Sequence, residues 1–300
     1  MKKYVVAIFM MLMSALALAD VGIATGSLTG TYVKIGQDIQ NVCEKTVNIS
    51  VYETAGSLSN IERIFSDKRI QYGIVQQDAL AYKAITDSAM MSKIKMIFPL
   101  YNEEIHLVAR ANSGINSIDD LAGKKVSVGQ ENSGNWVTSQ IIKAKTGIEF
   151  TEVNLDNAAA VKALLSGTID AAVIVGGKPM SVLQDVGQAG TGKLKLVAMK
   201  HPALEGFYIN STVPEGLYAW QKTAVKTYAV KSILATFAYK NPVMDKEITA
   251  LTRCIVGHLD DLQATGHTKW REVDPESYKQ VKWPIHPSAQ RELDSAKRRK

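Results

Sequence analysis

Apolar positions follow two alternating periods along most of this chain. Short apolar runs, such as Val21–Ala24, Ile70–Val75 and Ala171–Val175, are typical of buried strands. Each is followed by a loop rich in glycine or polar residues, and residues 33–42 then place apolar side chains at helical spacing after the first such loop. Strands that alternate with helices predict an α/β protein built on a parallel sheet.

The pattern of the first half of the chain returns in the second half. Lys68–Val75 and Gly167–Ile174 look alike, because each places a turn before an apolar strand. Two long extended runs lie within Ile97–Arg110 and Ala224–Tyr239. If both runs cross between the repeats, the chain forms two lobes joined by a hinge. Lobe one is then residues 20–110 plus about 225–300, and lobe two is residues 111–224.

The first nineteen residues show the pattern of a secretory signal peptide. Met1-Lys2-Lys3 is cationic, Tyr4–Ala19 is apolar except for Ser14, and Ala17-Leu18-Ala19 supplies a cleavage site of small residues. The alternative is an N-terminal membrane anchor, but the apolar run is shorter than the ~20 residues of a spanning helix. We therefore expect cleavage after Ala19 and export of a soluble mature chain.

Composition first suggests a basic protein, and the signal peptide changes that picture. The 300 residues carry a formal net charge of +6, with 46% hydrophobic and 21% charged residues. Loss of Lys2 and Lys3 lowers this charge to +4, and four of the remaining cations form the terminal run Lys297–Lys300. Such a run is usually solvated, and the sequence has no basic stripe with interleaved aromatic residues. A nucleic-acid partner is therefore not expected.

Residues that could catalyse a reaction or bind a metal are scattered along the sequence. The five histidines form no H-x-x-x-H motif or Cys/His cluster, and no G-x-S-x-G motif occurs. We therefore expect no catalytic residues, no metal and no cofactor. Cys43 and Cys254 lie 211 positions apart, and the sequence leaves open whether they form a disulfide or two buried thiols.

Four loops that join a strand end to a helix start point to anion binding. They are Gly26–Tyr32, Thr54–Asn60, Ser133–Trp136 and Gly176–Pro179. A helix N-terminus has unpaired N–H groups and partial positive charge, and glycine lets a ligand approach the backbone. Capped loops occur in every α/β protein, and Ser57 or Ser59 is itself expected to cap a helix. Four such loops at the carboxyl ends of strands nevertheless favour a ligand site between two lobes.

Three motifs resemble the TAXI family, the solute-binding subunits of tripartite ATP-independent periplasmic (TRAP) transporters. They are Ala24-Thr25-Gly26-Ser27-Leu28-Thr29-Gly30-Thr31-Tyr32, Thr54-Ala55-Gly56-Ser57-Leu58-Ser59-Asn60 and Tyr72-Gly73-Ile74-Val75-Gln76-Gln77-Asp78. In lobe two, Ile118–Val126 is similar to a segment shared widely among periplasmic binding proteins, and Pro284–Ala289 resembles the family's ending. The resemblance implies a type II periplasmic-binding-protein (Venus-flytrap) fold, a periplasmic location and a small carboxylate ligand, such as glutamate, glutamine or a dicarboxylate.

The resemblance also implies which residues line the ligand site. On the lobe-one side they are Ser27, Thr29, Gly30, Thr31, Tyr32, Gly56, Ser57, Gln76 and Asp78. On the lobe-two side they are Ser133, Gly134, Asn135, Gly176 and Gly177. Asn135-Trp136 departs from the threonine that usually follows Ser-Gly in the family, so Trp136 either reshapes the pocket or belongs to the core. Arg110 and Lys178 lie near the expected cleft edges, but the sequence identifies no charged partner for the ligand.

The sequence therefore predicts a monomeric receptor without enzymatic activity. It would close on its ligand and present both lobes to the permease subunits of a TRAP transporter. In one alternative, the same fold senses a ligand for a membrane sensor kinase. In another, the chain is an exported hydrolase of small anionic substrates, with Ser133 as nucleophile and a histidine as base.

Overall fold

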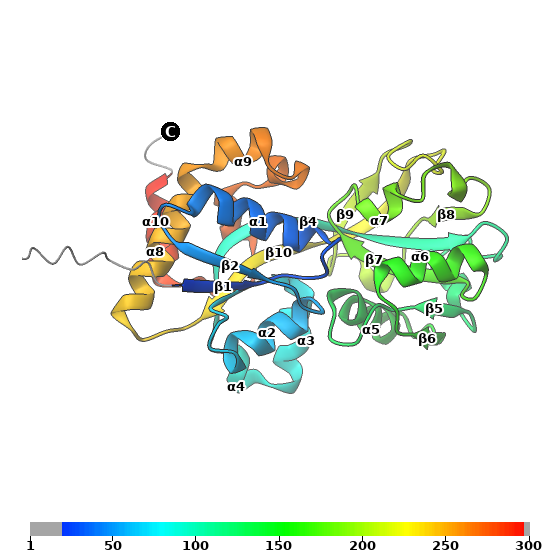
Figure 1. The fold of residues 1–300 in the computed structure, drawn as a ribbon. Coiled ribbons are helices and arrows are strands. Elements are labelled where there is room, and N and C mark those ends of the chain that lie inside the picture. The colour runs from blue at the N-terminus through cyan, green and yellow to red at the C-terminus, as the bar shows by residue number, and fades with distance from the viewer. Residues whose placement is uncertain (1–19, 297–300) are drawn as a thin grey trace, which may run out of the picture.

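The computed structural model describes residues 20–296 as a mixed α/β fold with two lobes (Figure 1). The predicted signal peptide, residues 1–19, and the basic run at residues 297–300 lie outside the described residues. The strands are β1 (Asp20–Ala24), β2 (Asn48–Tyr52), β3 (Tyr72–Gln76), β4 (Ile94–Arg110), β5 (Lys125–Ser127), β6 (Thr151–Val153), β7 (Ala171–Gly176), β8 (Leu194–Val197), β9 (Ile209–Val213) and β10 (Val225–Phe237).

Helices connect and cover these strands. The α-helices are α1 (Thr31–Cys43), α2 (Ser57–Ser66), α3 (Gln77–Thr86), α4 (Ser88–Met91), α5 (Gly134–Thr146), α6 (Asn157–Ser166), α7 (Ser181–Gln184), α8 (Pro242–Gly257), α9 (Leu259–Thr265) and α10 (Pro287–Ala296). Short 3-10 helices are η1 (Asp119–Leu121), η2 (Gly187–Gly190), η3 (Pro202–Leu204), η4 (Thr268–Glu272) and η5 (Pro275–Gln280). The alternation of strand and helix that the sequence predicts is therefore present in both halves of the chain.

The strands form one sheet with the order β2-β1-β3-β10-β4-β7-β5-β6, with β9 paired to β10 and β8 paired to β4. In lobe one, β1 pairs in parallel with β2 and β3, and in lobe two β5 pairs in parallel with β6 and β7. The last strand of each parallel set then meets a long antiparallel strand, β3 against β10 and β7 against β4. The two lobes thus repeat one strand order, as the likeness of Lys68–Val75 to Gly167–Ile174 predicts.

The long strands β4 and β10 carry the chain between the lobes (Figure 1). The first part of β4, from Ile94 to Pro99, pairs with β10, whereas Glu104–Ala109 pairs with β7 of lobe two. β10 pairs with β9 through Val225–Ala229 and with β3 of lobe one through Ser232–Thr236. β4 and β10 also pair with each other, so the two crossings lie side by side and are joined by hydrogen bonds. The exact lobe boundaries, at residues 110 and 225, are those predicted from the sequence.

Apolar packing is continuous from one lobe to the other. One cluster in lobe one joins α1 to α8 and α9 around Trp270, which is fully buried. A second cluster in lobe two contains Tyr218 stacked on Trp220, with ring centroids 5.6 Å apart. A third cluster includes Leu58 of α2 and Val137 of α5, so it extends across both lobes. The lobes are therefore packed together in this conformation.

The start of α2 differs from the expectation that Ser57 or Ser59 caps it. Its N-cap is Gly56, in a left-handed conformation with φ of 119°, and no side chain caps the first turn. The Ser57 hydroxyl instead accepts a hydrogen bond from the backbone N–H of Gln76, at 3.2 Å. Because that hydroxyl binds a neighbouring strand end, the N–H groups that begin α2 remain without a side-chain cap.

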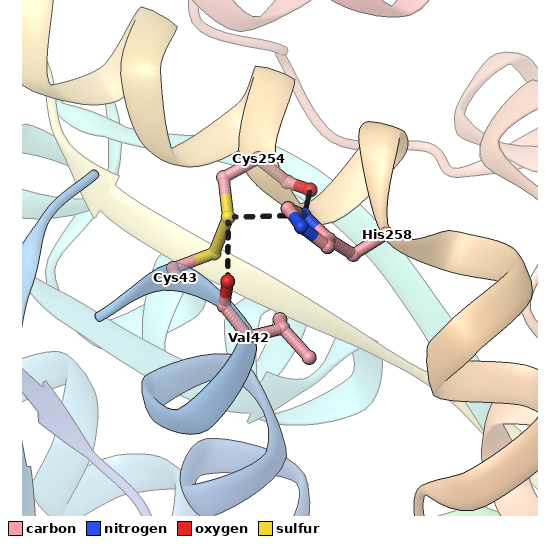
Figure 2. Close-up of a disulfide and its surroundings, with 4 residues drawn as sticks. All are labelled: Val42, Cys43, Cys254 and His258. Atoms are coloured by element: carbon pink, nitrogen blue, oxygen red, sulfur yellow. Dashed lines mark hydrogen bonds between the residues drawn. A yellow bond between two sulfur atoms is a disulfide. The ribbon is translucent and has the colours of Figure 1, made fainter. Parts of the chain in front are cut away.

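A disulfide joins Cys43 at the end of α1 to Cys254 in α8, which settles the pairing that the sequence leaves open (Figure 2). Both residues are buried, in the cluster that packs α1 against α8. Figure 2 shows His258 and the carbonyl of Val42 next to the Cys254 sulfur. The bond closes a loop across 211 positions of sequence, and it lies entirely within lobe one. A structural disulfide is typical of exported proteins.

Candidate functional site

A pocket lies where the strand–helix loops of the two lobes meet. It encloses about 620 Å³, counting space open to solvent, and both lobes contribute to its walls. Eleven of the residues that the resemblance implies line it: Ser27, Gly30, Thr31, Tyr32, Gly56, Ser57, Gln76, Ser133, Gly134, Asn135 and Gly176.

Three of the implied residues do not line this pocket. Asp78 is buried behind it, where its carboxylate accepts hydrogen bonds from Thr138 and Tyr208. Gly177 packs against Lys269, because an added Cβ there would lie 2.7 Å from the lysine side chain. Thr29 faces a separate surface hollow, and its carbonyl accepts a hydrogen bond from the Ser181 hydroxyl. Their positions fit roles in packing and lobe contact.

Eight further lining residues are absent from the set that the sequence implies. They are Gly26, Ala55, Glu103, Gln130, Asp156, Asn157, Val175 and Met180. Asp156 and Asn157 lie at the start of α6, which follows β6. The segment is therefore a fifth loop that joins a strand end to a helix start, like the other four. Glu103 carried no comparable signal, because it lies in the middle of a long strand and no motif contains it.

Two helices point uncapped N-termini at the pocket. The N-cap residues of α1 and α2 are Gly30 and Gly56, and neither helix has a side-chain cap. The first turn of each helix therefore has backbone N–H groups without a side-chain acceptor and carries partial positive charge. In α2 the N–H of Ser59 already donates to the carbonyl of Asn132. The third helix start differs, since the Ser133 hydroxyl accepts from the N–H of Trp136 at 3.1 Å and caps α5. Of these three helix starts, the two in the lobe-one wall are thus the ones without a side-chain cap.

A chain of buried polar side chains forms the floor on the lobe-one side. Tyr32 donates from its hydroxyl to Glu103 Oε1 at 2.7 Å, and the same hydroxyl lies 3.2 Å from the Ser57 Oγ. Ser57 in turn lies 3.3 Å from Gln76 Oε1. Burial raises the pKa of Glu103 to about 8, although the hydrogen bond from Tyr32 opposes this. The floor therefore holds a carboxyl group whose ionisation is disfavoured by its burial.

The lobes touch directly beside the pocket. Asp78 of lobe one accepts hydrogen bonds at Oδ2 from the hydroxyls of Thr138, at 2.7 Å, and Tyr208, at 3.0 Å, which both belong to lobe two. The backbone N–H of Ser59 donates to the carbonyl of Asn132 across the same boundary, at 3.2 Å. Burial raises the pKa of Asp78 to about 6, against the effect of these hydroxyl donors. The conformation is therefore a closed one.

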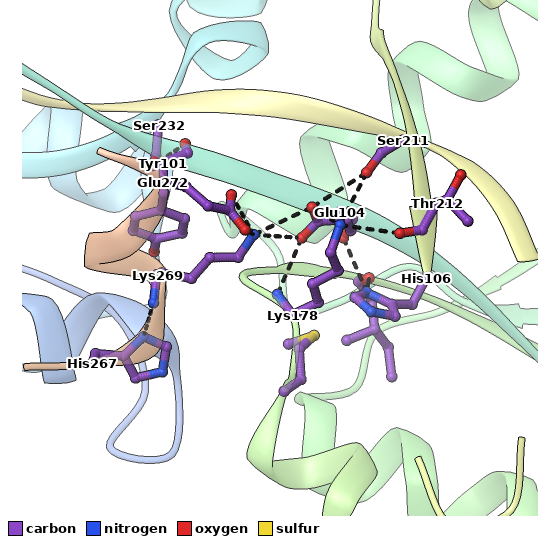
Figure 3. Close-up of polar contacts among 12 residues, drawn as sticks. Tyr101, Glu104, His106, Lys178, Ser211, Thr212, Ser232, His267, Lys269 and Glu272 are labelled. Carbon is purple, nitrogen blue, oxygen red and sulfur yellow. Dashed lines mark hydrogen bonds and ion pairs between the residues drawn. The ribbon is translucent and has the colours of Figure 1, made fainter. Parts of the chain in front are cut away.

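An ionic network lies at the crossing strands (Figure 3). Glu104 of β4 is 1% exposed, and its carboxylate lies 2.8 Å from Lys178 Nζ and 2.9 Å from Lys269 Nζ. Lys178 belongs to lobe two and Lys269 to lobe one, so a single carboxylate on β4 joins the two lobes. Burial acts to raise the pKa of Glu104, but Lys269 and Lys178 outweigh it and hold the pKa below its ordinary value.

The two basic residues near the expected cleft edges are occupied elsewhere. Arg110 pairs with Asp170 at 2.7 Å and Lys178 with Glu104, and neither lines the pocket. Among the described residues, no lysine or arginine lines this pocket, whereas Glu103 and Asp156 do. Any anionic ligand group here would consequently be bound by uncharged donors, namely backbone N–H groups, hydroxyls and side-chain amides.

Trp136 belongs to the core rather than to the pocket wall. Its ring meets that of Tyr82 edge to face, with centroids 5.8 Å apart, and it packs against the apolar cluster shared by both lobes. It is not among the residues that line the pocket. Of the two readings of Trp136, the structure therefore favours the one that makes it a packing residue.

The pocket does not contain the pair that a hydrolase would need. No histidine is among its lining residues within 20–296, and the Ser133 hydroxyl is engaged in capping α5. His106 is buried on β4 beside β7, where the Tyr218 hydroxyl contacts it at 2.9 Å, and burial lowers its pKa to about 4. Ser133 therefore has no histidine beside it among the described residues that line this pocket. Across the same described residues, no helix is long and apolar enough to cross a membrane.

Comparison with known proteins places this fold. The chain is similar to a TctC solute binding protein from Polaromonas solved without ligand, at 14% identity and a TM-score of 0.51 over 95% of this chain and 98% of that one. It is also similar to the periplasmic binding protein BugD, at 11% identity and 0.57 over 93% and 96%. A third similar structure is the substrate binding protein of an amino acid ABC transporter, at 14% identity and 0.54 over 83% and 100%.

These likenesses concern the fold, and they agree with the two-lobed Venus-flytrap architecture expected from the sequence. Family membership is shown by sequence, because the model of one protein family matches residues 23–294, nearly all of the described chain. The pocket, the paired crossing strands and the repeated strand order all lie within the matched residues. The chain belongs to the NMT1-like family.

Proposed function

We propose that this protein is an exported solute-binding receptor that captures a small carboxylate between its lobes. The observation that carries the proposal is the pocket at the lobe boundary, with two uncapped helix N-termini in its wall. A carboxylate there would accept hydrogen bonds from backbone N–H groups without needing an arginine. The residues of the α1 and α2 loops, with Ser133, Gly134 and Asn135 opposite, are the proposed ligand contacts.

Ligand binding would work by shifting the equilibrium between open and closed lobes. A ligand that bonds to both walls binds the closed form better, and it stabilises closure by that difference in affinity. Asp78, Thr138 and Tyr208 supply contacts that exist only when the lobes meet. Glu104 with its two lysines lies where the strands would bend. The closed form would then be the one recognised by a membrane partner.

The partner that we propose is the permease of a TRAP transporter, with the chain as a TAXI-type subunit in the periplasm. The motifs at residues 24–32, 54–60 and 72–78 support this, and all three lie at or beside the pocket. Two of the similar structures, a TctC solute binding protein and the substrate binding protein of an amino acid ABC transporter, agree with a receptor role. Genes for multi-span permeases beside this one would support transport, whereas a kinase gene would support sensing.

Isothermal titration tests the receptor function directly. The mature protein, starting at Asp20, is denatured and refolded to remove bound ligand, and is then titrated with amino acids, monocarboxylates and dicarboxylates. We expect at least one of these to bind with a 1:1 ratio. If the refolded protein shows native circular dichroism and binds none of them, the carboxylate-receptor proposal is wrong. Mass spectrometry of any ligand that co-purifies then identifies the natural solute.

A further inference from the structure

The charge of the pocket is unusual for a carboxylate site. Its wall has two uncapped helix N-termini, which favour an anion. Among the described residues that line it, however, Glu103 and Asp156 are the only acidic or basic ones. A ligand with two carboxylates would have to place one of them against an acidic wall. A ligand with a carboxylate and a cationic nitrogen would match both parts of the pocket.

Glu103 is the acid that is built into the floor of the pocket. Its side chain is 3% exposed, and Oε1 is held by the Tyr32 hydroxyl at 2.7 Å. The other oxygen, Oε2, accepts no hydrogen bond from the described residues. It is also not fully enclosed by protein atoms. One carboxyl oxygen is therefore positioned by the protein while the other is left for the pocket. Asp156 differs, because its Oδ1 caps α6 by accepting from the N–H of Ala159.

Several charged and titratable groups lie near Glu103. Asp78 and Glu104 oppose its ionisation, whereas Lys269 and the Tyr32 hydroxyl favour it. The Tyr101 phenol also faces it and is itself kept neutral by burial and by the Glu103 charge. Lys269 is already paired with Glu104 and Glu272, so it does not neutralise Glu103 directly. Burial outweighs the favourable groups, and an ionised Glu103 lacks a counter-charge in the empty pocket.

We propose that Glu103 is a specificity-determining residue that selects ligands carrying a protonated amine next to their carboxylate, and that it gives up its proton when such a ligand binds. The inference rests on the carboxylate receptor function proposed above. The ligand's ammonium group supplies the missing counter-charge, so Glu103 becomes an ionised acceptor. The proton of its carboxyl group passes to solvent, and the charge inside the pocket stays unchanged at that site.

This exchange predicts how affinity depends on pH. Below about pH 8, where the empty site is protonated, binding an ammonium group releases close to one proton, so affinity rises with pH by up to about tenfold per unit. A second carboxylate at this position would behave in the opposite way. It would accept a hydrogen bond from protonated Glu103 and bind more tightly at lower pH.

The experiment uses matched ligand pairs that differ only in the amine. They are L-glutamate with glutarate, L-aspartate with succinate, and L-leucine with 4-methylpentanoate. Wild type, Glu103→Gln and the control Glu62→Gln are titrated at pH 6, 7 and 8, in buffers of different ionisation enthalpy so that released protons are counted. Glu62 is a suitable control because it pairs with Lys83 on the outside of α2 and is not among the pocket's lining residues.

We expect wild type and Glu62→Gln to bind the amine of at least one pair about tenfold more tightly than its deaminated partner, with proton release. Glu103→Gln should lose both the preference and the proton release. Equal or tighter binding of the deaminated acids, proton uptake, or a preference that survives in Glu103→Gln would overturn the proposal. Proton counting on wild type decides the matter even if the variant does not fold. Failure of every carboxylate to bind would instead contradict the receptor function itself.

Discussion

A single glycine allows the two lobes to approach. A Cβ added at Gly134 of lobe two would lie 1.4 Å from Gln76 Oε1 and 3.1 Å from the Ser57 hydroxyl of lobe one. Gln76 is itself 2% exposed, so its side chain has little room to move away. The closed conformation thus depends on the absence of a side chain at this position.

Gly134→Ala should therefore weaken ligand binding without unfolding the protein. The methyl group would hold the loops apart in the closed form only, and we expect at least about a tenfold loss of affinity in titration, equivalent to ~1.4 kcal/mol. Gly257→Ala is the matched control, because no atom lies within 4 Å of its Cβ position and it sits in a helix. Unchanged affinity in Gly134→Ala would show that the lobes do not need this close contact.

Glu103 also links folding stability to pH. A glutamate in an unfolded chain titrates near 4.3, whereas the folded pKa is about 8. Between these values the folded protein binds the extra proton, so the free energy of unfolding falls as pH rises. The slope approaches ~1.4 kcal/mol per pH unit from this one group.

The slope is best measured between pH 7 and 8, above the pKa of about 6 for Asp78 and the lowered pKa values of His106, His267 and His286. Urea unfolding of the ligand-free protein should show stability declining across this window, and Glu103→Gln should flatten the decline. An equal slope in both proteins would mean that Glu103 is ionised in the folded state.

At the scale of elements, α1 is fixed by two different constraints at its two ends. Its N-terminus faces the pocket, and its last residue, Cys43, is bonded to α8. The tryptophan of η4 adds a further tie, because Trp270 donates from its ring nitrogen to Asp38 of α1 at 2.8 Å. The helix that offers N–H groups to the ligand is thus held rigidly to the rest of lobe one.

Removal of the disulfide should lower stability and leave ligand affinity nearly unchanged. We expect Cys43→Ala with Cys254→Ala to lose about 2–4 kcal/mol of unfolding free energy, the usual contribution of a disulfide. Urea unfolding measures this, and titration with the identified ligand checks affinity. Reducing agent should destabilise wild type but not the double variant. An affinity loss as large as the stability loss would contradict the view that the bond acts within lobe one alone.

At the scale of the whole molecule, closure rests on polar contacts as well as on apolar packing. Asp78 reaches from lobe one to two hydroxyls of lobe two, and its Oδ2 accepts a hydrogen bond from each. Hydrogen bonds to a charged group contribute about 1.5–3 kcal/mol each. Because these contacts form only when the lobes meet, they favour the closed form without touching the ligand.

Tyr208→Phe should therefore reduce ligand affinity by about tenfold or more, since it removes one of these bonds from the closed state. Tyr278→Phe is the matched control, because the Tyr278 hydroxyl donates to Asp294 inside lobe one. X-ray scattering should show a smaller radius of gyration on ligand addition for wild type and the control, and a weaker response for Tyr208→Phe. Identical behaviour of both variants would remove Tyr208 from the closure mechanism.

The sequence by itself determined the parts of this protein that depend on local patterns. Period-two and helical spacing gave the alternating strands and helices, the repeat at Lys68–Val75 and Gly167–Ile174 indicated two lobes, and glycine-rich loops located most of the pocket wall. These features are readable because neighbouring residues impose them. The cap of α2 was misjudged because the Ser57 hydroxyl is drawn to Gln76, which is distant in sequence.

Only the tertiary structure decided what depends on residues far apart in the chain. Cys43 is bonded to Cys254, and Asp78 lies at the contact between the lobes rather than in the pocket. Arg110 and Lys178 form ion pairs with Asp170 and Glu104. The tertiary structure also brought Glu103 to the pocket floor. Burial and long-range charge set the properties of such groups, and no local pattern encodes which distant side chains will surround them.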